Sequence, residues 1–508
     1  MTENIPLKEI LLQILNSTNT LSLEVFLSGI FLALIVMGLI LHKKNPAAMS
    51  SSGVQGIFYT SVLLTLLFAL GINYKQFFQT EDTFLFSKML FLDAKAIFFK
   101  GLLLLAALGM VVHAWLSRRS LPMEFYPLFI ALVLGLCFLT MSVNLLMIYL
   151  SIETVSIVSY ILTAIQKDRK GTEGGLKYLL FGAASSAVML YGMSLLYGMT
   201  GTLNIASPEF SRGIAQMDEV VAIITLLLTL SGFLFKLSVT PFHIWTPDVY
   251  EAAPSPIVAF FSTAPKIATF LLLLRFYFVI PISLQTITAV IAMATITFGN
   301  FSALWQNNAK RLLAYSTIAH SGMMLIALAI LSELGIKSIV FYLVVYLFTN
   351  LAAFYLIDLL ERSQLAKTWN PEESKLIKNM EDFAGLGRVF PYAGILLLVV
   401  MISLAGLPPT AGFMAKFSIF SALWESYQHS GNQALLILFV FGLLNTAVSL
   451  YFYLKMPFYM FMKTPKSIEE NTQIELSVQE YVFATILVAP LLLLFFKAGW
   501  LLDIIAIL

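Results

Sequence analysis

Residues 231–251 read SGFLFKLSVTPFHIWTPDVYE and contain a lysine in an unexpected place. Lys236 interrupts an apolar run that otherwise has the composition of a membrane-spanning helix, and Pro241 follows five residues later. A charge at the centre of a bilayer costs about 2.5–3.5 kcal/mol on the most lenient scale, so it needs a partner, water or a function. The stretch therefore predicts a helix that is broken inside the membrane and carries a functional lysine.

The composition of the whole chain agrees with a membrane location, because 59% of the 508 residues are hydrophobic and only 11% are charged. A bilayer core needs about 20 apolar residues per helix. By this length criterion, the sequence predicts an all-α polytopic membrane protein with about fourteen transmembrane helices. The expected spans are 21–42, 54–73, 96–116, 124–141, 143–166, 177–199, 219–242, 254–279, 283–306, 311–331, 336–360, 390–424, 433–459 and 481–501.

A second segment repeats the pattern of the first. Residues 411–417, AGFMAKF, match SGFLFKL in the order small residue, Gly, Phe, two others, Lys and an apolar residue. The preceding Pro408 and Pro409 cannot donate to the carbonyls of Leu404 and Ala405, just as Pro241 cannot donate to that of Leu237. We expect the glycine four residues before each lysine to leave room for the lysine side chain.

Broken helices at corresponding places in two halves point to an inverted-repeat transporter. We expect the seventh and twelfth spans to be broken and to belong to two inverted five-helix repeats. The predicted organisation is an N-terminal three-helix segment at 1–120, helices 4–8 at 121–280, helices 9–13 at 281–460, and helix 14 at 461–508.

Further charged residues lie within the expected spans. We expect Lys100 and Arg275 to extend their long side chains to an interface. Glu153, Lys266 and Lys416, like Lys236, lie too deep or have too short a side chain to do so, while Lys177 opens its span. A desolvated lysine and a nearby carboxylate shift each other's protonation, so the expected chemistry is proton carriage.

The distribution of basic residues predicts the orientation. Lys and Arg are concentrated in one set of alternate loops, which includes the loop 361–388, and this set is expected to face the cytoplasm. Both termini are then external, and the chain is expected to lie in the bacterial cytoplasmic (inner) membrane, surrounded by lipid and without a nucleic-acid partner.

Four long motifs resemble a known family. They are FKLSVTPFHIWTPDVYEAAPSPIVAFFSTAPKIA at 235–268, AKRLLAYSTIAHSGMM at 309–324, EGGLKYLLFGAASSAVMLYGMSLLYGMTGTLNI at 173–205 and LAGLPPTAGFMAKF at 404–417. They are similar to the antiporter-like membrane subunits of respiratory complex I, the NADH–quinone oxidoreductase, and among these to the subunit N group. The resemblance implies a glutamate at the twelfth-helix position in subunit M, so Lys416 argues against subunit M.

The resemblance implies a role for each matching residue in a proton relay coupled to quinone reduction elsewhere in the complex. The implied relay consists of Glu153 in the fifth helix, Lys177 in the sixth, Lys236 in the seventh, Lys266 in the eighth, His320 in the tenth and Lys416 in the twelfth. It also implies subunits M, K and J as neighbours. NADH, FMN, iron–sulfur clusters and quinone would be used by other subunits, with no cofactor in this chain.

Two alternatives stay open at this level, and a third finds no support. The chain could be a subunit of a multi-chain sodium–proton antiporter or of a membrane-bound hydrogenase with the same fold. A redox enzyme in its own right finds no support, because the single Cys137 excludes cysteine-ligated clusters within the chain and no Gly-x-Gly-x-x-Gly follows a strand. In a passive scaffold the buried lysines would only be paired.

Overall fold

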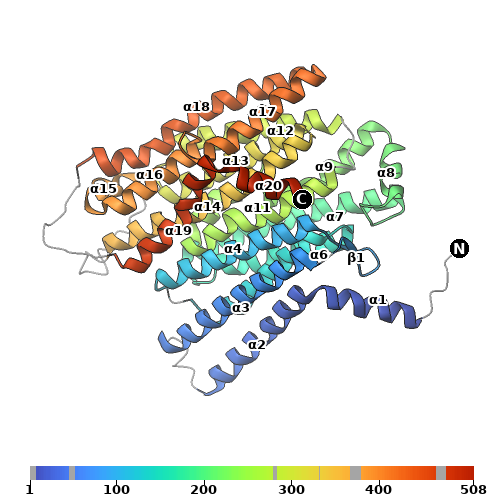
Figure 1. Ribbon diagram of the computed structural model, residues 1–508, viewed down its shortest axis with the longest axis horizontal. Coiled ribbons are helices and arrows are strands. Elements are labelled where there is room, and N and C mark those ends of the chain that lie inside the picture. Colours follow the sequence, from blue (N-terminus) through green and yellow to red (C-terminus); the bar gives the residue numbers. More distant parts are fainter. Residues whose placement is uncertain are drawn as a thin grey trace. The chain divides into compact units, whose positions relative to one another are not determined.

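The computed structural model describes residues 7–44, 52–79, 81–119, 121–277, 283–330, 332–365, 379–464 and 476–508. It is nearly all helical, as the composition predicts, with one two-stranded antiparallel hairpin (Figure 1). Twelve of the described helices are long and apolar enough to cross a membrane. The other two expected spans, 124–141 and 390–424, correspond to a helix of 17 residues and to a pair of helices separated by a break.

The first half of the chain contains α1 to α11 and the hairpin. Their bounds are α1 Leu7–Thr20, α2 Ser22–Lys44, α3 Ser52–Gln79, β1 Thr83–Leu85, β2 Leu90–Leu92, α4 Ala94–Leu116, α5 Phe125–Met141, α6 Leu145–Thr163, α7 Arg169–Thr200, α8 Pro208–Ala215, α9 Glu219–Lys236, α10 Trp245–Ala252 and α11 Ser255–Tyr277. The expected spans did not include α1, α8, α10 or the hairpin.

The second half contains α12 to α20 and a short 3₁₀ helix. Their bounds are α12 Ser283–Leu304, α13 Ala309–Ile330, α14 Glu333–Leu365, η2 Met380–Phe383, α15 Leu386–Val389, α16 Pro391–Ala405, α17 Ala411–Ser430, α18 Gln433–Met462, α19 Val478–Phe496 and α20 Ala498–Ile507. In Figure 1, α18 lies alongside α16 and α17, against which it packs. Part of the predicted cytoplasmic loop 361–388, residues 366–378, lies outside the described residues.

The chain divides into two compact units. One comprises residues 1–112, 119–233 and 264–280, and the other comprises residues 113–118, 234–263 and 281–508. Within the first unit α5 packs against α2 and α6, and α6 packs against α7. Within the second, α12 packs along α13, and α14 contacts α13, α16, α17 and α19.

Both lysine-bearing helices are interrupted near their prolines. Helix α9 ends at Lys236 instead of continuing to residue 242, and α10 begins at Trp245. Helix α16 ends at Ala405, Gly406 takes a left-handed conformation with φ of 81°, and α17 begins at Ala411. Each interruption includes a cis peptide bond before proline, Thr240–Pro241 and Pro408–Pro409.

Candidate functional site

Lys416 lies in the second turn of α17 and bridges the break between α16 and α17. Its Nζ donates hydrogen bonds to the carbonyl oxygens of Leu404 at 2.9 Å and Ala405 at 2.8 Å. These are the two carbonyls that Pro408 and Pro409, four residues later in the chain, cannot satisfy. The buried ammonium and the interrupted helix end thus satisfy each other.

Two glycines near the lysines have different tasks from the one expected. A Cβ at Gly412 would collide with the backbone carbonyl of Ser403, so this glycine allows α17 to approach α16 closely. Similarly, a Cβ at Gly232 would meet the side chain of Met189 on α7. The expectation that these glycines make room for the lysines is wrong, because their faces are occupied by the neighbouring helices. Room for Lys416 comes from Gly406, where a Cβ would lie 2.5 Å from Lys416 Cδ.

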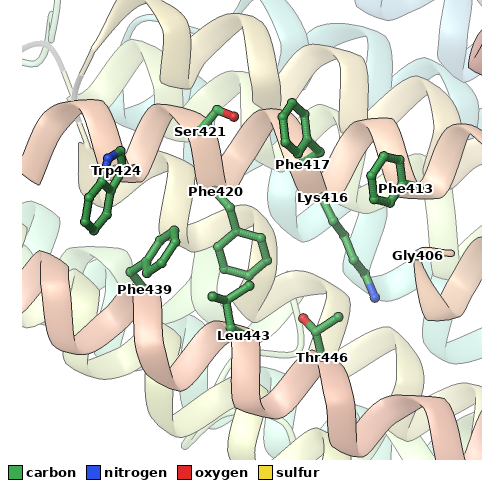
Figure 2. Close-up of a pocket in the computed structure, with 10 residues that line it drawn as sticks. All are labelled: Gly406, Phe413, Lys416, Phe417, Phe420, Ser421, Trp424, Phe439, Leu443 and Thr446. Carbon is green, nitrogen blue, oxygen red and sulfur yellow. The ribbon is translucent and has the colours of Figure 1, made fainter. Parts of the chain in front are cut away.

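A pocket of about 510 Å³ opens beside Lys416 between α17 and α18 (Figure 2). Its walls are mainly aromatic and aliphatic, and Figure 2 shows the Lys416 side chain extending past Phe413 toward Gly406. Ser421 and Thr446 contribute hydroxyl groups. Lys416 therefore borders this pocket on one side, whereas its ammonium group is buried at the ends of α16 and α17 on the other.

His320 lies on α13, which packs against α17, and both of its ring nitrogens face hydroxyl groups. Its Nδ1 lies 2.5 Å from the hydroxyl of Tyr342 on α14, and its Nε2 lies 3.0 Å from that of Tyr453 on α18. Tyr453 in turn lies 2.5 Å from Ser316 Oγ. A neutral imidazole accepts at one nitrogen and donates at the other. The chain of hydrogen bonds from Tyr342 through His320 to Tyr453 and Ser316 therefore suits proton transfer through the ring.

Two hydrogen bonds from Trp245 and Thr240 hold the backbone at the break after Lys236. The indole nitrogen of Trp245 donates to the carbonyl of Phe235 at 3.3 Å, and the amide of Thr240 donates to Thr295 Oγ1 on α12 at 3.2 Å. The Lys236 side chain is buried, with Nζ 5.7 Å from the centre of the Phe235 ring. These contacts fix the interrupted backbone around a buried cation.

The two acidic residues of the WTPDVYE stretch, Asp248 and Glu251, form ion pairs with Arg311. Arg311 on α13 donates to Asp248 Oδ1 at 2.8 Å and to Glu251 Oε2 at 3.1 Å. All three side chains are between a quarter and about a third exposed. Such pairs are worth little energetically, and this one docks α10 onto α13.

The remaining predicted residues belong to the other unit and lie in different surroundings. Lys266 on α11 is fully buried, directly after Pro265. Glu153 on α6 is half-buried, and its buried Oε1 has no hydrogen-bond partner in the described part of the chain. Lys177 is 40% exposed and pairs with Glu173 one turn away at 2.9 Å, because α7 begins at Arg169 and not at Lys177 as the expected span did.

A buried charged cluster was not predicted from the sequence. His113 Nε2 on α4 lies 3.2 Å from Asp358 Oδ2 on α14, which also accepts from Ser117 Oγ at 2.8 Å and from Arg362 Nε at 3.1 Å. Arg362 also reaches Glu480 on α19 at 3.2 Å. Asp358 stands alone in the apolar run FYLIDLL with Arg362 four residues later, a spacing that could have revealed it.

Lys100 and Arg275 do not extend to an interface, contrary to expectation. Lys100 is fully buried, and its Nζ lies 2.6 Å from Oε1 of the equally buried Glu24 on α2. Arg275 binds Asp93 Oδ1 at 2.6 Å, with both side chains 11% exposed. Each cation has a carboxylate partner from another part of the sequence, so neither needs the aqueous interface.

No group of three or more His, Cys, Asp or Glu residues placed to hold a metal ion occurs among the described residues. The buried titratable groups described above are lysines, carboxylates and histidines, with hydroxyl, carbonyl or carboxylate partners. This donor set suits the binding and release of protons.

Comparison with known proteins gives the family. The family described as NADH:quinone oxidoreductase/Mrp antiporter, TM, matches residues 142–444. NADH-quinone oxidoreductase subunit N of Chlorobium chlorochromatii (strain CaD3) is 35% identical over 494 residues, which cover 93% of this chain and 91% of that relative. The chain belongs to the subunit N family of NADH-quinone oxidoreductase.

Solved structures agree with the assignment to the subunit N family. A chain of respiratory complex I from Thermus thermophilus superposes with a TM-score of 0.76 and 30% identity, covering 95% of this chain and 98% of the other. A chain of the Mrp complex from Dietzia sp. DQ12-45-1b has a TM-score of 0.81 at 19% identity, covering 96% of both, and shows the shared antiporter-like fold alone. As a subunit N family member, the chain is a multi-pass membrane subunit of a respiratory complex that translocates protons.

Proposed function

We propose that this chain carries protons across the membrane by moving them between buried lysines and His320, within an assembled NADH-quinone oxidoreductase. The observation that carries the proposal is the position of Lys416 Nζ. It donates across the helix break to the carbonyls of Leu404 and Ala405, which have no partner within the helix. Unpaired carbonyls stabilise a protonated amine, whereas burial opposes the charge, so the two effects leave the amine able to gain and lose a proton.

His320 is the proposed neighbour of Lys416 in the relay. Its helix α13 packs against α17, and its two ring nitrogens face the hydroxyls of Tyr342 and Tyr453. When the ring accepts a proton at one nitrogen, it can release a proton from the other, so a proton passes through the ring without movement of the side chain. The hydroxyl of Ser316, which contacts that of Tyr453, extends this hydrogen-bonded chain by one group.

The proposal assigns the other residues by their surroundings. Lys236 and Lys266 are buried stations, the first at the helix break and the second beside Pro265. Glu153 and Lys177 are half-buried and exposed, which suits exchange with water or with a neighbouring subunit. The two lysine-bearing breaks would be the inner and outer stations of two inverted five-helix repeats, helices 4–8 within 121–280 and helices 9–13 within 281–460.

In the complete complex we expect antiporter-like subunit M and the small subunits K and J as neighbours. NADH, FMN, iron–sulfur clusters and quinone would be bound by other subunits, and electron transfer there would supply the energy. The membrane would be the bacterial inner membrane, with both termini on the periplasmic side, because basic residues concentrate in the opposite set of loops.

The orientation is open to a direct test. A single-cysteine variant, with Cys137 replaced and Asn370→Cys introduced, is expected to react with a membrane-impermeant thiol reagent only in inside-out vesicles. Reaction in intact cells would reverse the proposed topology.

The function itself is tested in membranes that carry the assembled complex. Lys416→Met is expected to remove proton pumping by the complex while the variant subunit still assembles. The measurement is proton uptake into inside-out vesicles per NADH oxidised. A normal ratio in Lys416→Met would contradict the relay.

The second candidate function is a subunit of a multi-chain sodium–proton antiporter or membrane-bound hydrogenase. It is favoured by the fold shared with the Mrp chain, whose TM-score is 0.81. The two functions are distinguished by purification of the native assembly. NADH oxidation that co-purifies with this subunit supports the respiratory complex, whereas sodium-dependent proton exchange without NADH oxidation supports the antiporter.

A further inference from the structure

Glu24 and Lys100 form an ion pair in the first unit, outside residues 142–444 that match the family. Lys100 Nζ lies 2.6 Å from Glu24 Oε1, and the two side chains are 0% and 1% exposed. Removing both charges from water costs several kcal/mol per ion, which is recovered only if the remaining donors and acceptors are also satisfied.

In this pair the remaining groups are not satisfied. Glu24 Oε2 has no hydrogen-bond partner within the described part of the chain. The second contact of Lys100 Nζ is the thioether sulfur of Met141 at 3.0 Å, which is a weak acceptor. The geometry is therefore that of a charged pair with capacity left for further hydrogen bonds.

The Asp93–Arg275 pair in the same unit shows the contrast. Asp93 Oδ1 accepts from Arg275 at 2.6 Å and from the backbone amide of Ala96 at 2.8 Å, so the carboxylate also caps the start of α4. Its side chain is 11% exposed and can meet water. The Asp93 carboxylate thus has two donors and a partly exposed surface, whereas Glu24 Oε2 has no donor among the described residues, although Arg275 Nε also lacks a hydrogen-bond partner there.

Glu24 also lines a pocket of about 400 Å³ that is bounded by α1, α2, the hairpin, α5 and α6. Most of the wall is apolar, including Phe86, Met89 and Met147, but the hydroxyl-bearing Thr18 and Ser28 contribute to it. One water occupies about 30 Å³ in the liquid and needs two to four polar partners. The pocket therefore has room for several waters next to the unsatisfied carboxylate.

We propose that Glu24 and Lys100 form an additional proton-carrying pair, which exchanges its proton with water in this pocket. The Lys100 ammonium gives a proton to the Glu24 carboxylate, which leaves a neutral amine and a neutral carboxylic acid. The acid then releases that proton to pocket water, and the amine takes up a new proton from the proton flow that the proposed function supplies, which restores the ion pair. This inference rests on the proposed function, namely that the chain carries protons.

The test compares three variants of the complete complex in membranes. Glu24→Gln combined with Lys100→Met leaves no unpaired charge, so the complex is expected to assemble and to lose most of its proton pumping per NADH oxidised. Lys100→Arg keeps the ion pair but cannot release its proton, and the same loss is expected. The matched control is Asp93→Asn combined with Arg275→Met, which is expected to keep the pumping ratio in the complex that assembles.

The outcomes separate this inference from the proposed function. Normal pumping in assembled Lys100→Arg, or in the assembled double variant, would overturn the inference. If Lys416→Met also pumps normally, the proposed function fails; if only the Glu24 and Lys100 variants pump normally, the additional pair alone fails.

A second measurement does not depend on how these variants fold. Ser28→Cys, with Cys137 replaced by alanine, places a thiol on the wall of the pocket. A water-soluble thiol reagent is expected to label this cysteine in the assembled complex. Complete protection from labelling on both sides of the membrane would show that the pocket has no aqueous connection and would overturn the proposal.

Discussion

Gly406 lies directly against the side chain of Lys416, so that a Cβ at position 406 would come within 2.5 Å of Lys416 Cδ and 3.2 Å of Nζ. The left-handed conformation of Gly406, with φ of 81°, ends α16 and turns the chain toward the proline pair. The same residue therefore ends the helix and leaves the space through which the lysine reaches the carbonyls of Leu404 and Ala405, which lack helical partners.

We predict that Gly406→Ala impairs proton pumping by displacing the Lys416 ammonium. The matched control is Gly431→Ala, because Gly431 also has a positive φ, 65°, but a Cβ added there would meet no atom within 4 Å. Both changes carry the backbone cost of about 1 kcal/mol for alanine in the left-handed region. Pumping per NADH oxidised should fall in Gly406→Ala only; an equal effect of both variants would show that backbone strain alone is responsible.

We predict that Lys416→Arg abolishes pumping even though it keeps the positive charge. A guanidinium can still donate to the carbonyls of Leu404 and Ala405, but it does not deprotonate in proteins. The control is Lys337→Arg, an exposed lysine paired with Glu333 in the same unit. Proton uptake and NADH oxidation are measured on the same vesicles. A scaffold role for Lys416 predicts the reverse, with arginine tolerated and methionine disruptive.

We predict that Tyr453→Phe slows proton transfer without unfolding the second unit. The change removes one hydroxyl between Ser316 and His320, and a lost hydrogen bond of this kind costs about 1 kcal/mol. Tyr355→Phe is the control, since its hydroxyl donates to the backbone carbonyl of Glu480, away from His320. Pumping should decline in the first variant and persist in the second. Equal pumping in both would remove Tyr453 from the relay.

We predict that Asp358→Asn destabilises the subunit strongly, because Asp358 is fully buried between His113, Ser117 and Arg362. Loss of one charge from such a cluster costs about 3 kcal/mol or more. Asp248→Asn, which weakens the partly exposed pair with Arg311, should cost about 1 kcal/mol or less. Thermal denaturation of the purified complex measures both. Similar midpoints for the two variants would show that the Asp358 cluster contributes little stability.

The sequence predicted those features that depend on near neighbours in the chain. Proline acts on a carbonyl at a fixed offset, so the carbonyls of Leu404 and Ala405 could be named in advance, and both bind Lys416. Helix positions followed from runs of apolar residues, and errors arose where a run crosses a break, as at residues 237–242.

Features that depend on distant parts of the chain could not be predicted in this way. His113 and Asp358 are 245 residues apart, and nothing in either helix indicates the other. The depth of Lys100 in its own span predicts an interface position, although the ion pair with Glu24 on another helix keeps its side chain buried. The role of the glycines before the lysines could not be predicted for the same reason, since the atoms that need the space belong to Met189 and Ser403. The proton-relay roles themselves stay predictions.

Helix α14 has 33 residues, which is more than a helix needs to cross the hydrocarbon core of a bilayer. At 1.5 Å per residue the helix is about 50 Å long, whereas the hydrocarbon core is about 30 Å thick. Even with the usual tilt, several turns must project into the headgroup layers. If the exposed Glu333 and Lys337 mark one border, the opposite border falls near Asp358, some 20 residues later, so that Arg362 lies among the lipid headgroups. The Asp358 cluster then belongs to the rim of the membrane, where lipids with anionic headgroups would compete with Glu480 for the Arg362 guanidinium.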